Sequence, residues 1–203
     1  MTTERPQLAW VPNALTLGRI AFIPVLIAAI LTFGTAQAFL GTSLLFALFV
    51  ILVLTDFLDG FLARRWGVTS DFGRMLDPIA DKLFVAGLLI CFAITTHGAW
   101  WVLAPTLVII GRDIFISGLR EHAAHEGIVM APTQLAKWKT ATEMFAIAAL
   151  LIWALLGQSS SDFGLIGMII ENAQTIGVVL LWIAAALSAY TGLHYAKSAL
   201  KKT

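Results

Sequence analysis

Long apolar segments constrain this chain more than any other feature, because several of them are long enough to cross a lipid bilayer. Hydrophobic residues make up 59% of the 203 residues and charged residues only 12%, whereas soluble domains carry about 25% charged residues. A helix needs about 20 apolar residues to span the bilayer core, and helices satisfy their own backbone groups in lipid. The sequence therefore predicts an all-α integral membrane protein.

Six segments have the length and hydropathy of transmembrane helices. Residues 1–12 precede them as a short mixed segment that suits the membrane surface. We expect residues 1–203 to form a single domain, a six-transmembrane-helix bundle with a short N-terminal interfacial segment. Residues 118–139 read as a polar connection, and residues 163–170 as an apolar stretch in the outer interface. The expected spans are residues 13–33, 38–56, 77–96, 99–116, 140–156 and 175–195.

The positions of Lys and Arg predict the orientation of these helices. With six spans, both termini share a side with the second and fourth loops, and the loops of the other side contain none of the thirteen Lys and Arg residues. Basic residues gather on the cytoplasmic side of a membrane. We therefore expect a multi-pass membrane protein whose two termini, together with the aspartate cluster described below, lie on the cytoplasmic side. The net charge of +1 gives no indication of a nucleic-acid partner.

Four aspartates lie at helical spacings in the stretch from Thr55 to Lys82. Asp56 and Asp59 are three residues apart, and Asp77 and Asp81 are four apart, so each pair shares one face of a helix. An aspartate in a membrane helix costs about 2.5–3.5 kcal/mol at the bilayer centre and less toward the interface. Four such residues in so apolar a chain therefore indicate a function.

Oxygen ligands of this kind favour Mg²⁺, Ca²⁺ or Mn²⁺, and no set of Cys and His residues suggests zinc. Two metal ions about 3.5–4 Å apart suit in-line displacement at phosphorus. Small residues near the aspartates would let a phosphate approach the backbone, and Arg64 could bind its oxygens. The alternative interpretations are that Asp77 caps a helix before Pro78 and that Asp71 is a solvated loop charge.

The complete pattern resembles the motif of the CDP-alcohol phosphotransferase family. It reads Asp56-x2-Asp59-Gly60-x2-Ala63-Arg64-x8-Gly73-x3-Asp77-x3-Asp81. The resemblance implies six transmembrane helices, a homodimer, and displacement of CMP from a CDP-linked donor by an alcohol. It also implies that the four aspartates bind Mg²⁺ or Mn²⁺, as two ions, and that Asp81 is the catalytic base. The implied contacts to the CDP moiety are Asp56, Asp59, Gly60, Ala63, Arg64, Gly73, Asn13 and Thr16.

Three further segments resemble the bacterial members of this family that use CDP-diacylglycerol as donor and sn-glycerol 3-phosphate as acceptor. They are Pro12 to Ile20, Gly111 to Glu121 and Leu135 to Thr140. This resemblance implies the bacterial inner membrane as the location. A dianionic acceptor requires two or three converging cations. The candidates near the cytoplasmic ends of spans four and five are Arg112, Arg120, Lys137 and Lys139.

Each basic residue also has a simpler interpretation, namely that it meets lipid headgroups as positive-inside residues do. A simpler interpretation of Asp113 is that it serves only as the ion-pair partner of Arg112, and His122 and His125 read as solvated loop residues. Other functions also remain open at this point. These are a related enzyme that uses serine, inositol phosphate or phosphatidylglycerol, a divalent-cation transporter, and a catalytically silent lipid- or nucleotide-binding protein.

Overall fold

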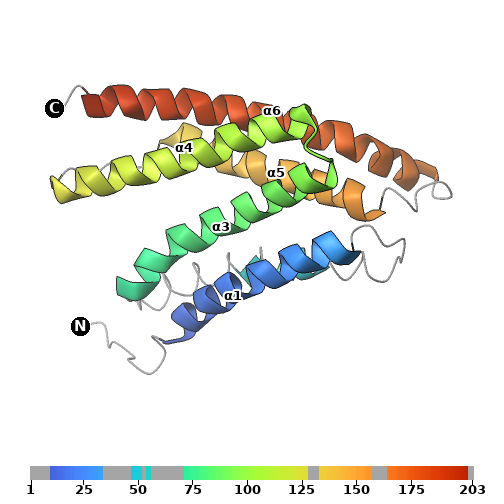
Figure 1. Ribbon diagram of the computed structural model, residues 1–203, viewed down its shortest axis with the longest axis horizontal. Coiled ribbons are helices and arrows are strands. Elements are labelled where there is room, and N and C mark those ends of the chain that lie inside the picture. Colours follow the sequence, from blue (N-terminus) through green and yellow to red (C-terminus); the bar gives the residue numbers. More distant parts are fainter. Residues whose placement is uncertain are drawn as a thin grey trace. The chain divides into compact units, whose positions relative to one another are not determined.

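The computed structural model describes residues 10–33, 47–51, 54–55, 71–127, 133–156 and 164–200. The chain divides into two compact units, Met1–Cys91 and Phe92–Thr203. Throughout the described part the regular structure is α-helical. The helices labelled in Figure 1 are α1 (Trp10–Phe33), α3 (Asp71–Thr95), α4 (Trp100–His125), α5 (Gln134–Leu156) and α6 (Gly164–Leu200).

Three of the described helices contain segments long and apolar enough to cross a membrane. These segments are Pro78–Thr95 in α3, Trp100–His125 in α4 and Asn172–Lys197 in α6. Helix α1 contains a shorter apolar segment, Ile20–Thr32. The prediction of an all-α membrane protein is thus confirmed. Most of the expected second span lies outside the described residues, although residues 47–51 and 54–55 are helical.

In the first unit, α1 packs against the part of α3 that precedes Cys91, and the two helices run in the same direction (Figure 1). Gly87 permits the close approach, because a Cβ atom there would lie 2.5 Å from Cδ1 of Ile27. The ring of Phe84 stacks on that of Phe49 with a centroid distance of 5.8 Å. Small residues and close van der Waals packing are what hold helices together in lipid.

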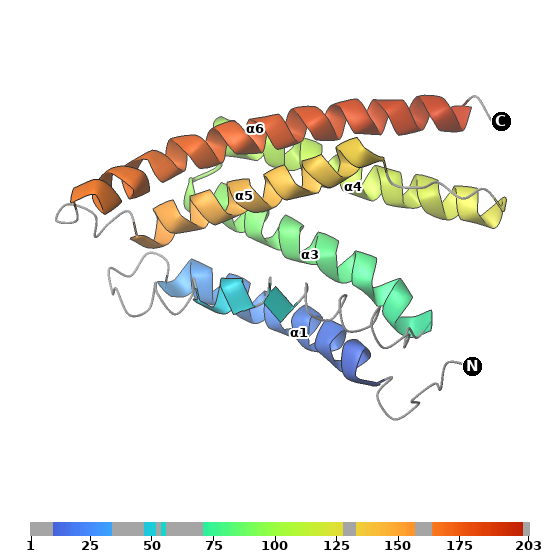
Figure 2. The same cartoon turned by 180° about the vertical axis from the view of Figure 1, so that it is seen from behind.

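In the second unit, α6 packs along both α5 and α4. Figure 2 shows α5 running antiparallel to α6, while α4 runs in the same direction as α6. Gly177 lies at the contact with α5, where an added Cβ atom would be 2.8 Å from Cγ of Leu150. Trp182 of α6 donates a hydrogen bond from Nε1 to the carbonyl oxygen of Trp101 at 3.1 Å. Of these helices, α4 carries Arg112 and Arg120, and α5 carries Lys137 and Lys139.

Two predicted helix starts were too late, and prolines explain the error. Helix α1 begins at Trp10 rather than at residue 13, with Pro12 in its first turn, where a proline's missing N–H is not needed. Helix α3 begins at Asp71, before the expected start at residue 77, and contains Pro78 in its interior. Asp77 therefore lies inside a helix, and the interpretation of Asp77 as a helix cap is wrong.

Polar residues also continue the helices where loops were expected. Helix α4 extends to His125 and α5 begins at Gln134, so much of residues 118–139 is helical. His122 and His125 lie on α4 rather than in a loop, and both are exposed. Residues 164–170, expected as a separate interfacial stretch, belong to α6. At about 1.5 Å per residue, this helix is longer than the bilayer core is thick.

Candidate functional site

The aspartate stretch is described only in part. Asp56, Asp59, Gly60, Ala63 and Arg64 lie outside the described residues. So do the side chains of Asn13, Thr16, Gly73 and Asp77, although their backbones are helical. Among the side chains that the structure describes, no group of three His, Cys, Asp or Glu residues could hold a metal ion. Three of the four aspartate side chains lie outside that set, so the predicted metal site stays a prediction.

Helix α3 nevertheless places two of the aspartates on one face. Asp77 and Asp81 are one turn apart on this helix. The same face continues with Val85 and Leu88, which are buried at 7% and 1% exposure, whereas Asp81 is exposed. Along this face, α3 therefore changes from buried apolar side chains at Val85 and Leu88 to an exposed carboxylate at Asp81. Two carboxylates one turn apart on a helix can serve as two ligands of one cation.

The second unit contains a polar cluster between α4, α5 and α6. Helix α4 contributes Arg112 and Asp113 to this cluster. Nη1 of Arg112 donates to Oδ1 of Asp113 at 3.0 Å, and Nη2 donates to Oγ1 of Thr191 on α6 at 3.0 Å. Helix α6 comes close at Gly192, where a Cβ atom would be 3.1 Å from Cγ of Arg112. The guanidinium group is thereby held between two helices.

Lys139 is the member of the cluster on α5, and it is buried. Its Nζ atom lies 2.7 and 2.8 Å from the two carboxylate oxygens of Asp113 and 2.6 Å from Oε1 of Glu143. Glu143 is also buried, and it accepts a hydrogen bond from Ser188 of α6 at 3.5 Å. Lysine has three N–H donors, so these three carboxylate oxygens occupy its full capacity.

Arg120 lies farther along α4 and contacts Tyr195 of α6. Its Nη2 atom is 3.4 Å from the hydroxyl oxygen of Tyr195, and its guanidinium carbon lies 5.4 Å from the centre of the ring. The same hydroxyl oxygen accepts the backbone N–H of Thr133 at 3.0 Å. Thr133 in turn accepts the N–H of Ala136 at the start of α5. Tyr195 thus links the end of α4 to the beginning of α5.

A cavity of about 450 Å³ opens beside these groups. Two of its lining residues, Arg112 and Arg120, have a buried Nε–H with no hydrogen-bond partner among the described residues. Buried donors of this kind are rarely left unpaired, so the arrangement favours an anion as ligand. The lining residues are Arg112, Arg120, Ala136, Lys137, Thr140, Ala141 and Met144.

The structure therefore brings three of the four predicted acceptor residues to one cavity and sets the fourth apart. Arg112, Arg120 and Lys137 line the cavity, while Lys139 is bonded to carboxylates. Two helical residues that are two positions apart lie on nearly opposite faces. This geometry explains why Lys137 is exposed and Lys139 is buried.

Sequence analysis missed the contributions of α6. Ser188, Thr191 and Tyr195 are buried, and all three contact the polar cluster or Arg120. Their spacing of three and four residues puts them on one face of an otherwise apolar helix. Such a polar stripe within a membrane span was a usable signal.

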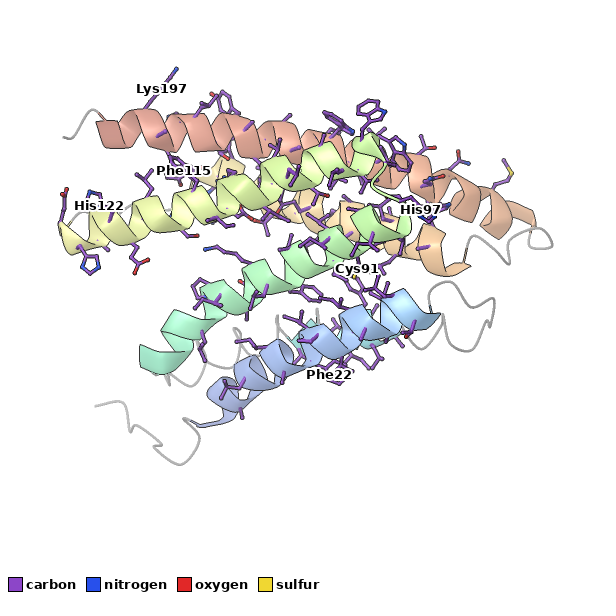
Figure 3. The ribbon with its side chains drawn as sticks, in the orientation of Figure 1. Phe22, Cys91, His97, Phe115, His122 and Lys197 are labelled. Atoms are coloured by element: carbon purple, nitrogen blue, oxygen red, sulfur yellow. The ribbon has the colours of Figure 1, made fainter. Side chains whose placement is uncertain are left out.

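Two basic or titratable side chains away from this cluster, Lys197 and His122, lie at the surface. Figure 3 shows Lys197 extending away from α6 and His122 at the far end of α4. Nε2 of His122 is 3.5 Å from Oε1 of Glu126, and both side chains are mostly exposed. The exposure of His122 matches its interpretation as a solvated side chain, although it lies on α4 rather than in a loop.

A family model described as CDP-alcohol phosphatidyltransferase matches residues 9–190, which is most of the chain and includes the whole aspartate motif. The chain belongs to this family. The resemblance inferred from the aspartate motif is thus confirmed. The matched range spans both compact units and ends before Tyr195.

Several curated relatives of this CDP-alcohol phosphatidyltransferase chain are named CDP-diacylglycerol–glycerol-3-phosphate 3-phosphatidyltransferase. One from Rickettsia bellii is 38% identical over 190 residues, which cover 94% of this chain and 95% of the relative. One from Arabidopsis thaliana is 36% identical and covers 91% of this chain and 77% of the relative. A relative from Oryza sativa subsp. japonica, 34% identical over 94% of this chain and 57% of its own length, is named cardiolipin synthase (CMP-forming).

Proposed function

We propose that this chain transfers the phosphatidyl group of CDP-diacylglycerol to sn-glycerol 3-phosphate, giving phosphatidylglycerophosphate and CMP. The observation that carries the choice of acceptor is the cavity with Arg112, Arg120 and Lys137 in its wall. A phosphate monoester is largely dianionic at neutral pH, and guanidinium groups bind its oxygens in pairs. A neutral acceptor such as serine does not require three cations. The names of the Rickettsia relatives support the same choice.

The donor's diphosphate is assigned to the four aspartates, Asp56, Asp59, Asp77 and Asp81. Their carboxylates form a hard oxygen donor set that fits Mg²⁺ or Mn²⁺, and α3 carries two of them one turn apart. We assign two ions to this set. When bound, divalent cations at these ligands supply positive charge against the diphosphate and the departing CMP.

The remaining motif residues are assigned to the CDP moiety. Gly60, Ala63 and Gly73 leave room for the nucleotide beside the backbone, and Arg64 binds phosphate oxygens. Asn13 and Thr16, in the first turns of α1, complete this set. The acyl chains of the donor remain in the lipid.

Asp81 is assigned the role of general base. Its carboxylate accepts the proton of the 1-hydroxyl group of glycerol 3-phosphate. The hydroxyl oxygen bonds to the phosphorus that carries the diacylglycerol, and the bond from this phosphorus to CMP breaks. Arg112, Arg120 and Lys137 hold the acceptor's own phosphate during this step, which keeps the hydroxyl group oriented.

The chain's placement follows from the distribution of its charges. We propose a multi-pass protein of the cytoplasmic membrane, with both termini and the site on the cytoplasmic side, as basic residues favour. Residues 1–203 form one catalytic domain, because the family model spans both compact units. We further propose a homodimer, as the family resemblance implies.

The experiment that tests this function measures CMP release by the purified protein in detergent with CDP-diacylglycerol and Mg²⁺. The acceptor panel is glycerol 3-phosphate, serine, inositol phosphate and phosphatidylglycerol. Release with glycerol 3-phosphate alone, abolished by EDTA and restored by Mg²⁺ or Mn²⁺, is the expected result.

Other outcomes would change the proposal in defined ways. Release with phosphatidylglycerol would assign the reaction named for the Oryza sativa relative, and release with serine would remove the role of the cationic cavity. An absence of release with every acceptor would overturn the enzymatic function, and metal uptake in vesicles would then test a transporter.

A further inference from the structure

A network of charged side chains lies beside the cavity, and most of its members do not line the cavity wall. It consists of Arg112, Asp113, Lys139 and Glu143 on α4 and α5. We propose that Lys139 and Glu143 are positioning residues that hold Arg112 in place for the acceptor phosphate by acting through Asp113. This inference rests on the proposed function, since it assigns Arg112 to the acceptor.

The bonding of Lys139 argues against a direct contact with the acceptor. All three oxygens near its Nζ atom belong to Asp113 and Glu143, at 2.6–2.8 Å. The Lys139 side chain is only 3% exposed, and it is not among the described residues that line the cavity. A lysine with three occupied donors would have to give up a carboxylate to bind phosphate.

Asp113 connects Lys139 to the cavity wall. Its Oδ1 atom accepts hydrogen bonds from both Nζ of Lys139, at 2.7 Å, and Nη1 of Arg112, at 3.0 Å. Thr191 accepts from Nη2 of the same guanidinium group. With Nη1 and Nη2 fixed in this way, the planar group has one orientation, and its Nε–H is left without a partner among the described residues.

A purely structural role is an inefficient use of this network, because burying its charges costs desolvation free energy. Two cations and two carboxylates lie close together between two predominantly apolar helices, and Lys139 and Glu143 are each 2% exposed. Buried ion pairs are often no more stabilising than apolar side chains of similar volume, and ionisable residues in membrane helices mark functional sites. Orientation of Arg112 is a function that the observed contacts can perform.

Lys137 provides a natural comparison on the same helix. It is exposed and lines the cavity, and within the described part of the chain it forms no ion pair with Asp113 or Glu143. We therefore expect Lys137 to act on the acceptor directly and Lys139 to act only through Arg112. Two residues that act through one contact give non-additive effects when both are changed, whereas independent contacts give additive effects.

The test is a double-mutant cycle on the full-length protein in detergent. The affinity for sn-glycerol 3-phosphate is measured by calorimetry in wild type and in the single variants Arg112→Ala, Lys139→Met and Lys137→Met. It is also measured in the two double variants that combine Arg112→Ala with Lys139→Met or with Lys137→Met. Lys197→Met is the matched control, since Lys197 is exposed on α6. Affinity for CDP-diacylglycerol serves as the check that each variant is folded.

We expect Lys139→Met to weaken acceptor binding about tenfold, which corresponds to the loss of a charge-assisted hydrogen bond. The double variant with Arg112→Ala should bind no more than about twofold more weakly than Arg112→Ala alone. The effects of Lys137→Met and Arg112→Ala should multiply. If the effects of Lys139→Met and Arg112→Ala also multiplied, Lys139 would be a direct phosphate contact, and the inference would be overturned.

Glu143→Gln covers the case in which Lys139→Met does not fold. The amide keeps the shape of the side chain and an oxygen that Lys139 can reach, but Lys139 then pairs with Asp113 alone. Lys139 should then compete more strongly with Arg112 for Oδ1 of Asp113, and acceptor binding should weaken several-fold. Glu143→Gln should have no further effect in a protein that already carries Arg112→Ala. Unchanged affinity in Glu143→Gln would overturn the inference.

The same measurements separate this inference from the proposed function. Wild-type protein that binds glycerol 3-phosphate but releases no CMP refutes the enzymatic function, while the cycle still reports on Lys139. Wild-type protein with no measurable affinity for glycerol 3-phosphate or inorganic phosphate overturns the inference itself.

Discussion

Two regions of this chain place charged residues in an apolar sequence, and they are built in different ways. The aspartate motif comes from one continuous stretch, residues 56–81, so spacing alone reveals it. The cationic cavity and its buried network combine α4, α5 and α6, and Arg112 and Thr191 are 79 residues apart. Local periodicity can reveal the first kind of site, whereas the second kind depends on helix packing.

The proposed function predicts that the two regions differ in kinetics. Changes in the aspartates should lower kcat, because the proposal assigns these residues to the reacting groups. Changes in the cavity should raise the KM for glycerol 3-phosphate, because the proposal assigns its side chains to the acceptor's remote phosphate.

The largest effect is expected for Asp81→Asn. Loss of a general base lowers kcat by about 10²–10⁴-fold, and the KM for glycerol 3-phosphate should stay within a few-fold of wild type. Steady-state CMP release measures both constants. Near-normal kcat would remove Asp81 from the role of base and would blur the contrast between the regions.

Arg112→Ala should have the next largest effect. Removal of charge-assisted hydrogen bonds to phosphate costs about 1.5–3 kcal/mol, which raises the KM for glycerol 3-phosphate about 10–100-fold. The fold should survive because Asp113 keeps its bond to Lys139. A loss of kcat at unchanged KM would contradict the assignment of Arg112 to the acceptor.

Gly177→Ala tests how far the second region depends on helix packing. An added methyl group would lie 2.8 Å from Cγ and 3.1 Å from the backbone nitrogen of Leu150. Overpacking of this kind costs about 1–3 kcal/mol, so thermal unfolding in detergent should shift to lower temperature. Gly118→Ala is the matched control, because nothing lies within 4 Å of its added Cβ atom. Equal Tm values for the two variants would contradict the packing argument.

The smallest effect is expected for Tyr195→Phe. The variant keeps the ring beside Arg120 but removes the oxygen that accepts the N–H of Thr133. A neutral hydrogen bond contributes about 0.5–1.5 kcal/mol, so the KM for glycerol 3-phosphate should rise only a few-fold. The exposed Tyr190 supplies the matched control, Tyr190→Phe, which should behave as wild type. Identical kinetics in the two variants would exclude a role for the Tyr195 hydroxyl group.

Sequence reasoning identified the membrane helices and the family because both depend on local patterns. Apolar length predicts spans such as Pro78–Thr95 and Asn172–Lys197 whatever their neighbours are. Helix ends were less accurate, since the expected starts at residues 13 and 77 adjoin Pro12 and Pro78, whereas the helices begin at Trp10 and Asp71. A proline only removes one donor and restricts the preceding turn, and the surrounding helix can accommodate that loss in a membrane protein.

The sequence by itself determined the chain's class, its family and which residue types are available for chemistry. Only the tertiary structure decided that Lys137 lines the cavity while Lys139 is bonded to Asp113 and Glu143. The physical reason is that helical periodicity defines the face on which a residue lies but not the helix that packs against that face. Thr191 and Tyr195 became partners of the two arginines through the packing of α6 against α4.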